Sequence, residues 1–145
     1  QFLIIGEGPY LQSVKEAVNK YPIKFLENVP HDEIIKYYNQ CSIFIQTSRA
    51  EGLPTCVLEA LSCEVPVVAS NVGGTNEIII NGVNGFLFEN GNINQSIEYL
   101  NRIKNNNLYN DFGKNGREII RKKFSWEAIT KKIIFIYNKV LSERI

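Results

Sequence analysis

Short apolar segments of strand length alternate with amphipathic segments of helical length through most of this chain. Apolar runs without polar alternation are typical of parallel strands that are buried on both faces. Strands that alternate with helices predict an α/β fold in which a parallel sheet lies between two layers of helices, a three-layer α/β/α arrangement. The predicted strands cover residues 2–5, 24–26, 43–46, 67–69 and 86–88.

Predicted helices connect these strands. They cover about residues 10–20, 31–40 and 75–79, and one more begins near Pro54. Pro54 suits a helix start, because the amide that proline lacks would have no partner in the first turn. After Phe88 the strand pattern stops, and the segment from Asn92 to Gln95 reads as a capping box that opens a further helix. Two more helices close the chain.

The last predicted helix, which begins at Ser125, has an apolar face wider than one small sheet needs. Two interpretations remain open: this face packs into the core of the domain, or it docks on a second domain outside this sequence. The apolar residues are Ile129, Ile133, Ile136, Tyr137 and Val140, with Ile134 and Phe135 widening the face.

Composition indicates one globular domain. The chain has 145 residues, 44% of them hydrophobic and 21% charged, and it contains no repeat or linker. Sixteen basic residues against fifteen acidic ones give a net charge of +1, which does not favour nucleic acid as a partner. The sequence opens directly on a strand and contains no methionine, so we expect a piece of a longer protein.

The cysteines indicate reduced thiols. Cys41, Cys56 and Cys63 form no C-x-x-C pair and lie away from the single histidine, His31, so neither a metal site nor a disulfide framework is predicted. No apolar run approaches the roughly 20 residues of a membrane span, and the first residues lack the basic-then-apolar layout of a signal peptide. These features predict a cytoplasmic protein. A basic cluster over residues 117–123 is either a solvated helix face or a peripheral contact with an anionic membrane.

Ligands of open parallel sheets bind outside the carboxyl ends of the strands, so the loops after the strands carry the functional signal. The first such loop contains Gly6 and Gly8, in partial agreement with a dinucleotide fingerprint. That fingerprint requires glycine or alanine where this chain has Leu11, so a nicotinamide cofactor is not favoured.

The loop over residues 47–55 has better defined chemistry. Gly52 lets the backbone approach a ligand, and Pro54 opens a helix whose free amides and positive dipole end suit a phosphate or diphosphate. Glu51 in the loop and Glu59 in the helix are placed to flank the same ligand. The alternative is that Glu51 caps the helix and Glu59 is a solvated helix acid.

Three further loops are less specific. Gly73 and Gly74 follow the fourth strand and are either turn formers or a ligand contact. Residues 81–85 form a tight Asn-Gly turn, to which we assign a structural role. The backbone of Asn28 and Val29, after the second strand, is able to offer polar groups to a base.

Taken together, these motifs resemble the C-terminal domain of the family 4, or group 1, retaining glycosyltransferases. The resemblance covers nearly the whole chain, and its most specific element is the pair Glu51 and Glu59 in an E-x7-E arrangement. It implies half of a GT-B fold, in which two Rossmann-like domains face each other across a cleft. The matching segments are residues 25–29, 48–54 (SRAEGLP), 58–60 (LEA), 65–70 (VPVVAS), 72–74 (VGG), Glu77, 81–85 (NGVNG) and 124–126 (FSW).

The resemblance implies that this is the domain that binds the donor, a nucleoside-diphosphate sugar, and that no cofactor or metal ion is needed. Glu51 is then the catalytic acid beside the donor sugar, and Glu59 holds the ribose hydroxyls. The remaining substrate-binding residues implied are Gly52, Leu53, Pro54, Thr55 and Cys56 for sugar and diphosphate, Asn28 and Val29 for the base, and Gly6 and Gly8 at the crevice floor.

Two parts of the family pattern are absent from this sequence. The arginine and lysine that clamp the diphosphate precede the point where the chain begins, and the N-terminal domain that binds the glycan or lipid-linked acceptor is missing. We therefore expect the isolated domain to bind donor weakly and to be inactive. Two rival functions share the fold: a GT-B sugar-nucleotide epimerase and a non-catalytic nucleotide-sugar binding module. The presence of both Glu51 and Glu59 favours the transferase.

Overall fold

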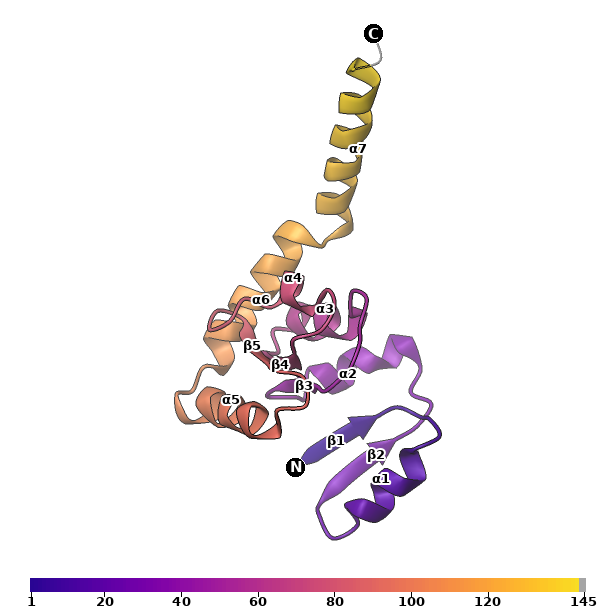
Figure 1. The fold of residues 1–145 in the computed structure, drawn as a ribbon, viewed down its shortest axis with the longest axis vertical. Helices are drawn as coiled ribbons and strands as arrows, with labels where there is room; N and C mark the ends of the chain where they lie inside the picture. Colours follow the sequence, from indigo (N-terminus) through magenta and orange to yellow (C-terminus); the bar gives the residue numbers. More distant parts are fainter. Residues whose placement is uncertain (144–145) are drawn as a thin grey trace. The chain divides into compact units, whose positions relative to one another are not determined.

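The computed structural model describes residues 1–143, which belong to two compact units. The first unit is Gln1–Tyr37, and the second begins at Tyr38 (Figure 1).

In the first unit, β1 (Phe2–Ile5) pairs in parallel with β2 (Ile23–Leu26), and α1 (Leu11–Ala17) connects them. Exposed and half-buried residues alternate along β1, and Phe2 is 61% exposed. Because successive side chains of a strand point to opposite faces, this pattern indicates one covered face. The prediction that every strand is buried on both faces is therefore wrong for β1. A short 3-10 helix, η1 (His31–Glu33), leads into α2 (Ile34–Tyr38), whose last residue opens the second unit.

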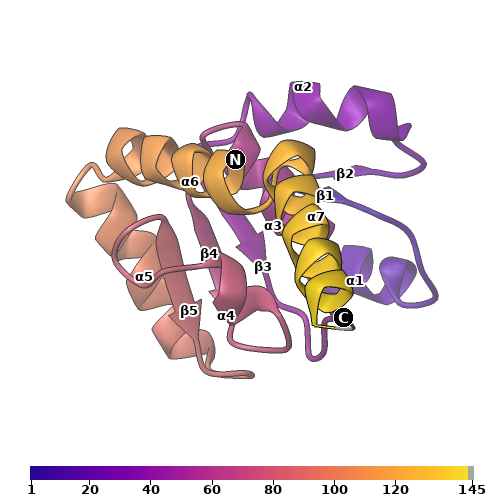
Figure 2. The ribbon, with the colours of Figure 1, turned by 90° about the horizontal axis from the view of Figure 1, so that it is seen from above.

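The second unit contains a parallel sheet of three strands. Figure 2 shows β4 (Val67–Ser70) between β3 (Phe44–Gln46) and β5 (Gly85–Phe88). All four residues of β4 are buried, as the sequence predicts for a central parallel strand. Each observed strand starts and ends within one residue of its prediction.

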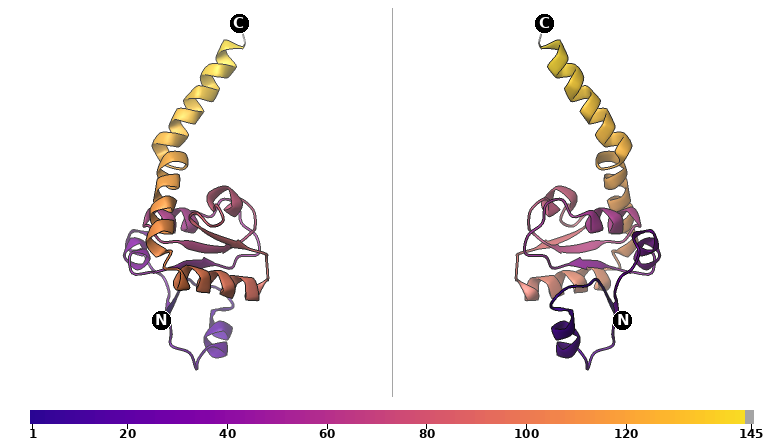
Figure 3. Two further views of the ribbon diagram at one scale, coloured as in Figure 1. Left: turned by 90° about the vertical axis from the view of Figure 1, so that its left-hand side faces the viewer. Right: turned by 90° about the vertical axis from the view of Figure 1, so that its right-hand side faces the viewer.

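Helices cover both faces of this sheet and complete the predicted three-layer α/β/α arrangement. Figure 3 shows α3 (Thr55–Ser62) and α4 (Thr75–Ile78) on one face and α5 (Ile93–Asn105) on the other. The Asn92 side chain accepts a hydrogen bond from the Gln95 amide at 3.1 Å, which confirms the predicted start of α5. The next helix, α6 (Tyr109–Lys123), packs against α3.

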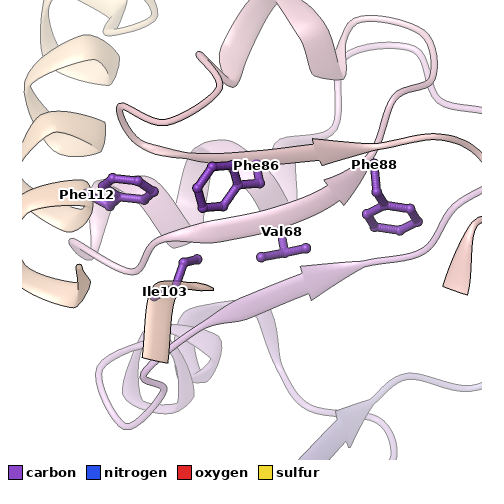
Figure 4. Packing of buried hydrophobic residues seen from close by; sticks show 5 residues of the cluster. All are labelled: Val68, Phe86, Phe88, Ile103 and Phe112. Carbon is purple, nitrogen blue, oxygen red and sulfur yellow. The ribbon is translucent and has the colours of Figure 1, made fainter. Parts of the chain in front are cut away.

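The core on the α5 side of the sheet is aromatic and aliphatic (Figure 4). Val68, Phe86 and Phe88 from the sheet meet Ile103 of α5 and Phe112 of α6. Burial of such a side chain stabilises the fold by roughly 1.5–3 kcal/mol. This core fixes the sheet whose carboxyl edge carries the candidate site.

The last helix, α7 (Trp126–Ser142), begins as predicted, because the Ser125 hydroxyl accepts a hydrogen bond from the Ala128 amide at 3.2 Å. Its apolar face is exposed: none of its residues is buried, and Phe135 is 68% exposed. The interpretation that this face packs into the domain core is therefore wrong for the described chain. The reason is that, among the described elements, α7 packs mainly against α6. Docking on a second domain stays a prediction.

Candidate functional site

The N-terminus of α3 lies directly after the loop that follows β3. Pro54 is buried at the N-cap position, and the amides of Val57 and Leu58 donate to its carbonyl oxygen at 3.2 and 3.4 Å. The amides of Thr55 and Cys56 precede these bonds and have no partner within the helix. In the described chain no side chain caps α3, so the alternative in which Glu51 is the cap is wrong. The uncapped helix end is able to bind an anion.

The loop before α3 is held by hydrogen bonds from three different segments. The Ser70 hydroxyl donates to the Ser48 carbonyl at 2.6 Å, and the Asn90 amide side chain donates to the Arg49 carbonyl at 3.4 Å. The backbone amide of Gly74 donates to the Gly52 carbonyl at 2.7 Å. These bonds tie the loop to the ends of β4 and β5 and to the glycine pair that follows β4.

Gly73 and Gly74 lie against the backbone of this loop. A Cβ atom at Gly73 would lie 1.8 Å from the carbonyl oxygen of Glu51, and Gly73 has φ of +52°. A Cβ atom at Gly74 would lie 2.6 Å from the carbonyl oxygen of Gly52. A side chain at either position would push the loop away. The glycine pair is therefore required for close approach to the loop that carries Glu51.

Glu51 is held by the residue that ends β3. The Gln46 side-chain amide donates to Glu51 Oε1 at 3.0 Å, and its nitrogen also lies 3.7 Å from the Cys56 sulfur. Gln46 is 6% exposed, and Glu51 is half-buried. The Glu51 carboxylate is thus fixed at the carboxyl edge of the sheet, next to the start of α3.

Glu59 is held by Tyr38, the first residue of the second unit. The Tyr38 hydroxyl donates to Glu59 Oε2 at 3.1 Å, and the Tyr38 ring packs edge-on against Phe44 with 5.7 Å between ring centroids. Burial, together with the negative charge of Glu59, raises the pKa of Tyr38, which keeps the hydroxyl protonated as a donor. Glu59 is half-buried and hydrogen-bonded, so the interpretation of Glu59 as a solvated helix acid is wrong.

Both glutamates act on the same thiol. Burial raises the pKa of Cys56, and the negative charges of Glu51 and then of Glu59 raise it further. Gln46 contacts both Glu51 and Cys56, which places the Glu51 carboxylate beside the first turn of α3. Glu59 lies one turn further along the helix.

The predicted site residues fall into two groups. The second unit brings together those at the start of α3, with Leu53 exposed and Pro54 buried. The first unit holds the others in the turns after β1 and β2, where Gly6, Gly8 and Asn28 have φ of +147°, +153° and +51°. The first group consists of Glu51, Gly52, Leu53, Pro54, Thr55, Cys56 and Glu59, and the second of Gly6, Gly8, Asn28 and Val29.

Gln46 and Tyr38 contact the two glutamates of the candidate site and were not predicted from the sequence. The one signal for Gln46 is a polar residue that ends an otherwise apolar strand. Tyr38 gives no signal, because it lies 21 residues from Glu59 and the contact depends on the tertiary fold.

Two further properties concern ions and membranes. Across residues 1–143, no group of three or more histidine, cysteine, aspartate or glutamate side chains is arranged to hold a metal ion. Within the same residues, no helix combines the length and the apolar character that crossing a bilayer requires.

Comparison with known proteins gives consistent matches. The family model described as glycosyl transferases group 1 matches residues 1–119. The chain is 35% identical over 143 residues to an uncharacterized glycosyltransferase of Methanocaldococcus jannaschii, covering 96% of this chain and 40% of the relative. It is 30% identical over 151 residues to a capsular polysaccharide biosynthesis glycosyltransferase of Staphylococcus aureus, covering 99% and 39%.

A solved structure matches as well. The crystal structure of a point mutant of Staphylococcus aureus TarM in complex with fondaparinux, alpha-GlcNAc-glycerol and UDP superimposes with a TM-score of 0.80 at 28% identity. The match covers 95% of this chain and 29% of that one. The chain spans about two fifths of the length of the curated relatives it matches.

Proposed function

Because the chain belongs to the group 1 glycosyl transferase family, we propose that it is the donor-binding domain of a retaining glycosyltransferase of GT-B type. The donor is a nucleoside-diphosphate hexose, and the acceptor is a glycan or a lipid-linked glycan. The observation that carries this proposal is the pair of held glutamates, Glu51 and Glu59, around the uncapped start of α3.

The diphosphate of the donor belongs at the N-terminus of α3. The amides of Thr55 and Cys56 are directed to that end by the helical backbone, and the helix dipole adds positive potential there. Negative charge develops on the diphosphate as the bond to the sugar breaks, and fixed amide donors stabilise it without reorganisation. In this proposal no metal ion or cofactor is needed for that step.

The two carboxylates then have separate roles. Glu59 accepts hydrogen bonds from the vicinal ribose hydroxyls, a pairing that a carboxylate with two oxygens suits. Glu51, in the loop before α3, accepts hydrogen bonds from the donor sugar and lies beside the reacting carbon. In a retaining reaction the acceptor oxygen bonds to the face of that carbon from which the diphosphate leaves, and the departing phosphate takes the acceptor proton.

Relatives support the choice of donor and acceptor. The TarM crystal contained UDP together with saccharides, and the Staphylococcus aureus relative serves capsular polysaccharide biosynthesis. The longer relatives have chain beyond the matched part, and we assign acceptor binding to such a further N-terminal domain. By itself the present chain is then a donor-binding module without transferase activity.

We place the protein in the cytoplasm, because all three cysteines are free thiols within the described chain. Residues 117–123 are the segment through which we propose peripheral contact with the inner membrane face. Arg117 pairs with Glu64, and Arg121 and Lys122 pair with Glu118, which reduces the positive charge offered to lipid. Pelleting with anionic liposomes tests that contact.

The transferase proposal is tested on the whole protein that carries this chain. It is incubated with UDP-, GDP- and ADP-hexoses and a glycan acceptor, and the anomeric configuration of the product is determined by NMR. We expect transfer with retention, and a loss in kcat of about a hundredfold or more for Glu51→Gln. Glu98→Gln, an exposed change on α5, is the control. An inverted product, or full activity of Glu51→Gln, contradicts the proposal.

A further inference from the structure

Gln46 ends β3 with a side chain that is 6% exposed. A glutamine amide carries two donors and an acceptor, and burial removes water from all of them. Buried polar groups in folded proteins are nearly always paired. Within residues 1–143, however, the carbonyl oxygen of Gln46, Oε1, is buried and has no hydrogen-bond partner. The fold uses one end of this amide and leaves the other unpaired.

The end in use points at the candidate catalytic group. Gln46 Nε2 donates to Glu51 Oε1 at 3.0 Å and lies 3.7 Å from the Cys56 sulfur. The opposite orientation of the amide would bring Oε1 against the carboxylate, and two acceptors repel each other. The hydrogen bond to Glu51 therefore fixes which way the Gln46 amide faces.

Glutamine at position 46 is expected to make the fold less stable than an apolar residue would. An unpaired buried acceptor costs roughly 1–3 kcal/mol, whereas an apolar side chain of the same length would leave no unpaired group. The neighbouring core positions of the sheet, such as Val68 and Ala69, are apolar, as expected for a strand of this kind. What glutamine adds over an apolar residue is a neutral hydrogen-bond donor to the Glu51 carboxylate.

We propose that Gln46 is a positioning residue that holds the Glu51 carboxylate toward the donor sugar. This inference rests on the proposed function, because it assumes that Glu51 contacts the sugar. Gln46 then controls the part of donor affinity that comes from the sugar, and leaves the nucleotide part to Glu59 and Tyr38. A role in core packing alone predicts the opposite pattern, a loss of stability with no selective effect on the sugar.

The first test compares the wild-type chain with Gln46→Met, which keeps the length of the side chain and removes the amide. Calorimetric titrations with UDP, GDP and ADP are paired with titrations of UDP-glucose, GDP-mannose and ADP-glucose. The readout is the sugar increment, the factor by which the sugar nucleotide binds more tightly than its nucleotide. We expect Gln46→Met to reduce this increment at least fivefold, to change nucleotide affinity less than twofold, and to unfold at the wild-type temperature or above.

The outcomes separate the two proposals. An unchanged sugar increment in Gln46→Met, or an equal loss of nucleotide and sugar-nucleotide affinity, overturns the role of Gln46. Nucleotide binding without any increment in the wild-type chain overturns that role but leaves the nucleotide site in place. If no nucleotide binds at all, the proposed function fails, and the inference fails with it.

A second variant, Gln46→Glu, tests the proposal through the pH dependence of the sugar increment, which a role in packing alone would not change. The introduced carboxyl group lies close to Glu51, and two carboxylates at that distance do not both ionise readily. One carboxyl group of the pair therefore has a raised pKa and keeps its proton to a higher pH. Below that pKa the introduced O–H donates to Glu51, as the amide did, and above it the two charges repel.

We therefore expect the sugar increment of Gln46→Glu to match the wild type at low pH and to disappear as the pH rises, while the wild-type increment stays constant. The other titratable groups of the neighbourhood, Tyr38, Cys56 and Glu59, are common to both proteins. Unfolding temperatures in the same buffers check that the chain stays folded. An increment of Gln46→Glu that does not change with pH overturns the proposal.

Discussion

The Tyr38 hydroxyl donates a hydrogen bond of 3.1 Å to the Glu59 carboxylate and so joins the first residue of the second unit to the middle of α3. This bond orients a carboxylate that would otherwise have the rotamer freedom of a helix-surface glutamate. A positioned carboxylate recognises a pair of hydroxyls better, because less entropy is lost when the hydrogen bonds form. Tyr38 is therefore part of the candidate site, although we do not expect it to touch the ligand.

Tyr38→Phe tests this bond through its pH dependence. At neutral pH we expect the variant to lose about 1.5–3 kcal/mol of unfolding free energy, the usual value of a hydrogen bond to a charged group. The folded pKa of Tyr38 is raised, so its stabilising contribution is complete below about pH 10, the ordinary tyrosine value, and falls as the pH rises above it. The stability difference between wild type and variant should shrink correspondingly.

Urea unfolding at neutral pH and at alkaline pH measures this difference. Tyr10→Phe serves as the control, because Tyr10 is 78% exposed. A difference between wild type and Tyr38→Phe that grows with pH would contradict the assignment.

Gly73→Ala tests the close approach of the glycine pair to the Glu51 loop. The new methyl group would lie 1.8 Å from the Glu51 carbonyl oxygen, and the residue has a positive φ. Gly91 also has a positive φ, +82°, but nothing lies within 4 Å of the position of its Cβ. Gly91→Ala therefore shows only the backbone cost of about 1–2 kcal/mol.

We expect Gly73→Ala to lose ~1–3 kcal/mol of unfolding free energy from overpacking, in addition to the backbone cost. We also expect it to weaken nucleotide binding. Denaturant midpoints and titration with nucleotide measure both effects. Equal stability of the two alanine variants would show that the loop moves away freely, contrary to our account.

Gly113→Ala and Gly116→Ala test the packing of α6 on α3. A Cβ atom at Gly113 would lie 2.0 Å from the carbonyl oxygen of Glu64, whereas one at Gly116 would meet the end of the Leu61 side chain at 2.6 Å. A side-chain tip can rotate away, but the backbone after α3 cannot. Alanine also gains about 1 kcal/mol over glycine in a helix.

The free energy of unfolding should therefore change little in Gly116→Ala and fall by ~1–3 kcal/mol in Gly113→Ala. Thermal unfolding of both variants makes the comparison. The reverse order of stability would rule out the contact with the Glu64 backbone as the reason why position 113 requires glycine.

Much of the second unit could be predicted from local sequence. Apolar runs placed β3, β4 and β5 within one residue, and the N-caps Asn92 and Ser125 placed the starts of α5 and α7, because both signals act over a few residues. The position of Glu51 before α3 and of Glu59 within it followed from their place relative to Pro54.

Features set by tertiary contact could not be predicted. The partners of the two glutamates, Gln46 and Tyr38, are fixed by tertiary contacts within the second unit. The close approach of Gly73 depends on the register of two loops. The sequence did not decide between core packing and docking on another domain for the apolar face of α7, because periodicity shows that a face is apolar without showing what covers it.

The most direct test of the donor-binding account is calorimetric titration of this chain with UDP, GDP and ADP, repeated with Glu59→Ala and with Glu98→Ala as control. The account predicts that one nucleotide binds and that Glu59→Ala weakens it about tenfold or more, as expected for ~1–3 kcal/mol of lost hydrogen bonds. Glu98→Ala should bind as the wild type does. Binding that is unchanged in Glu59→Ala, or no binding of any of the three nucleotides, would contradict the account.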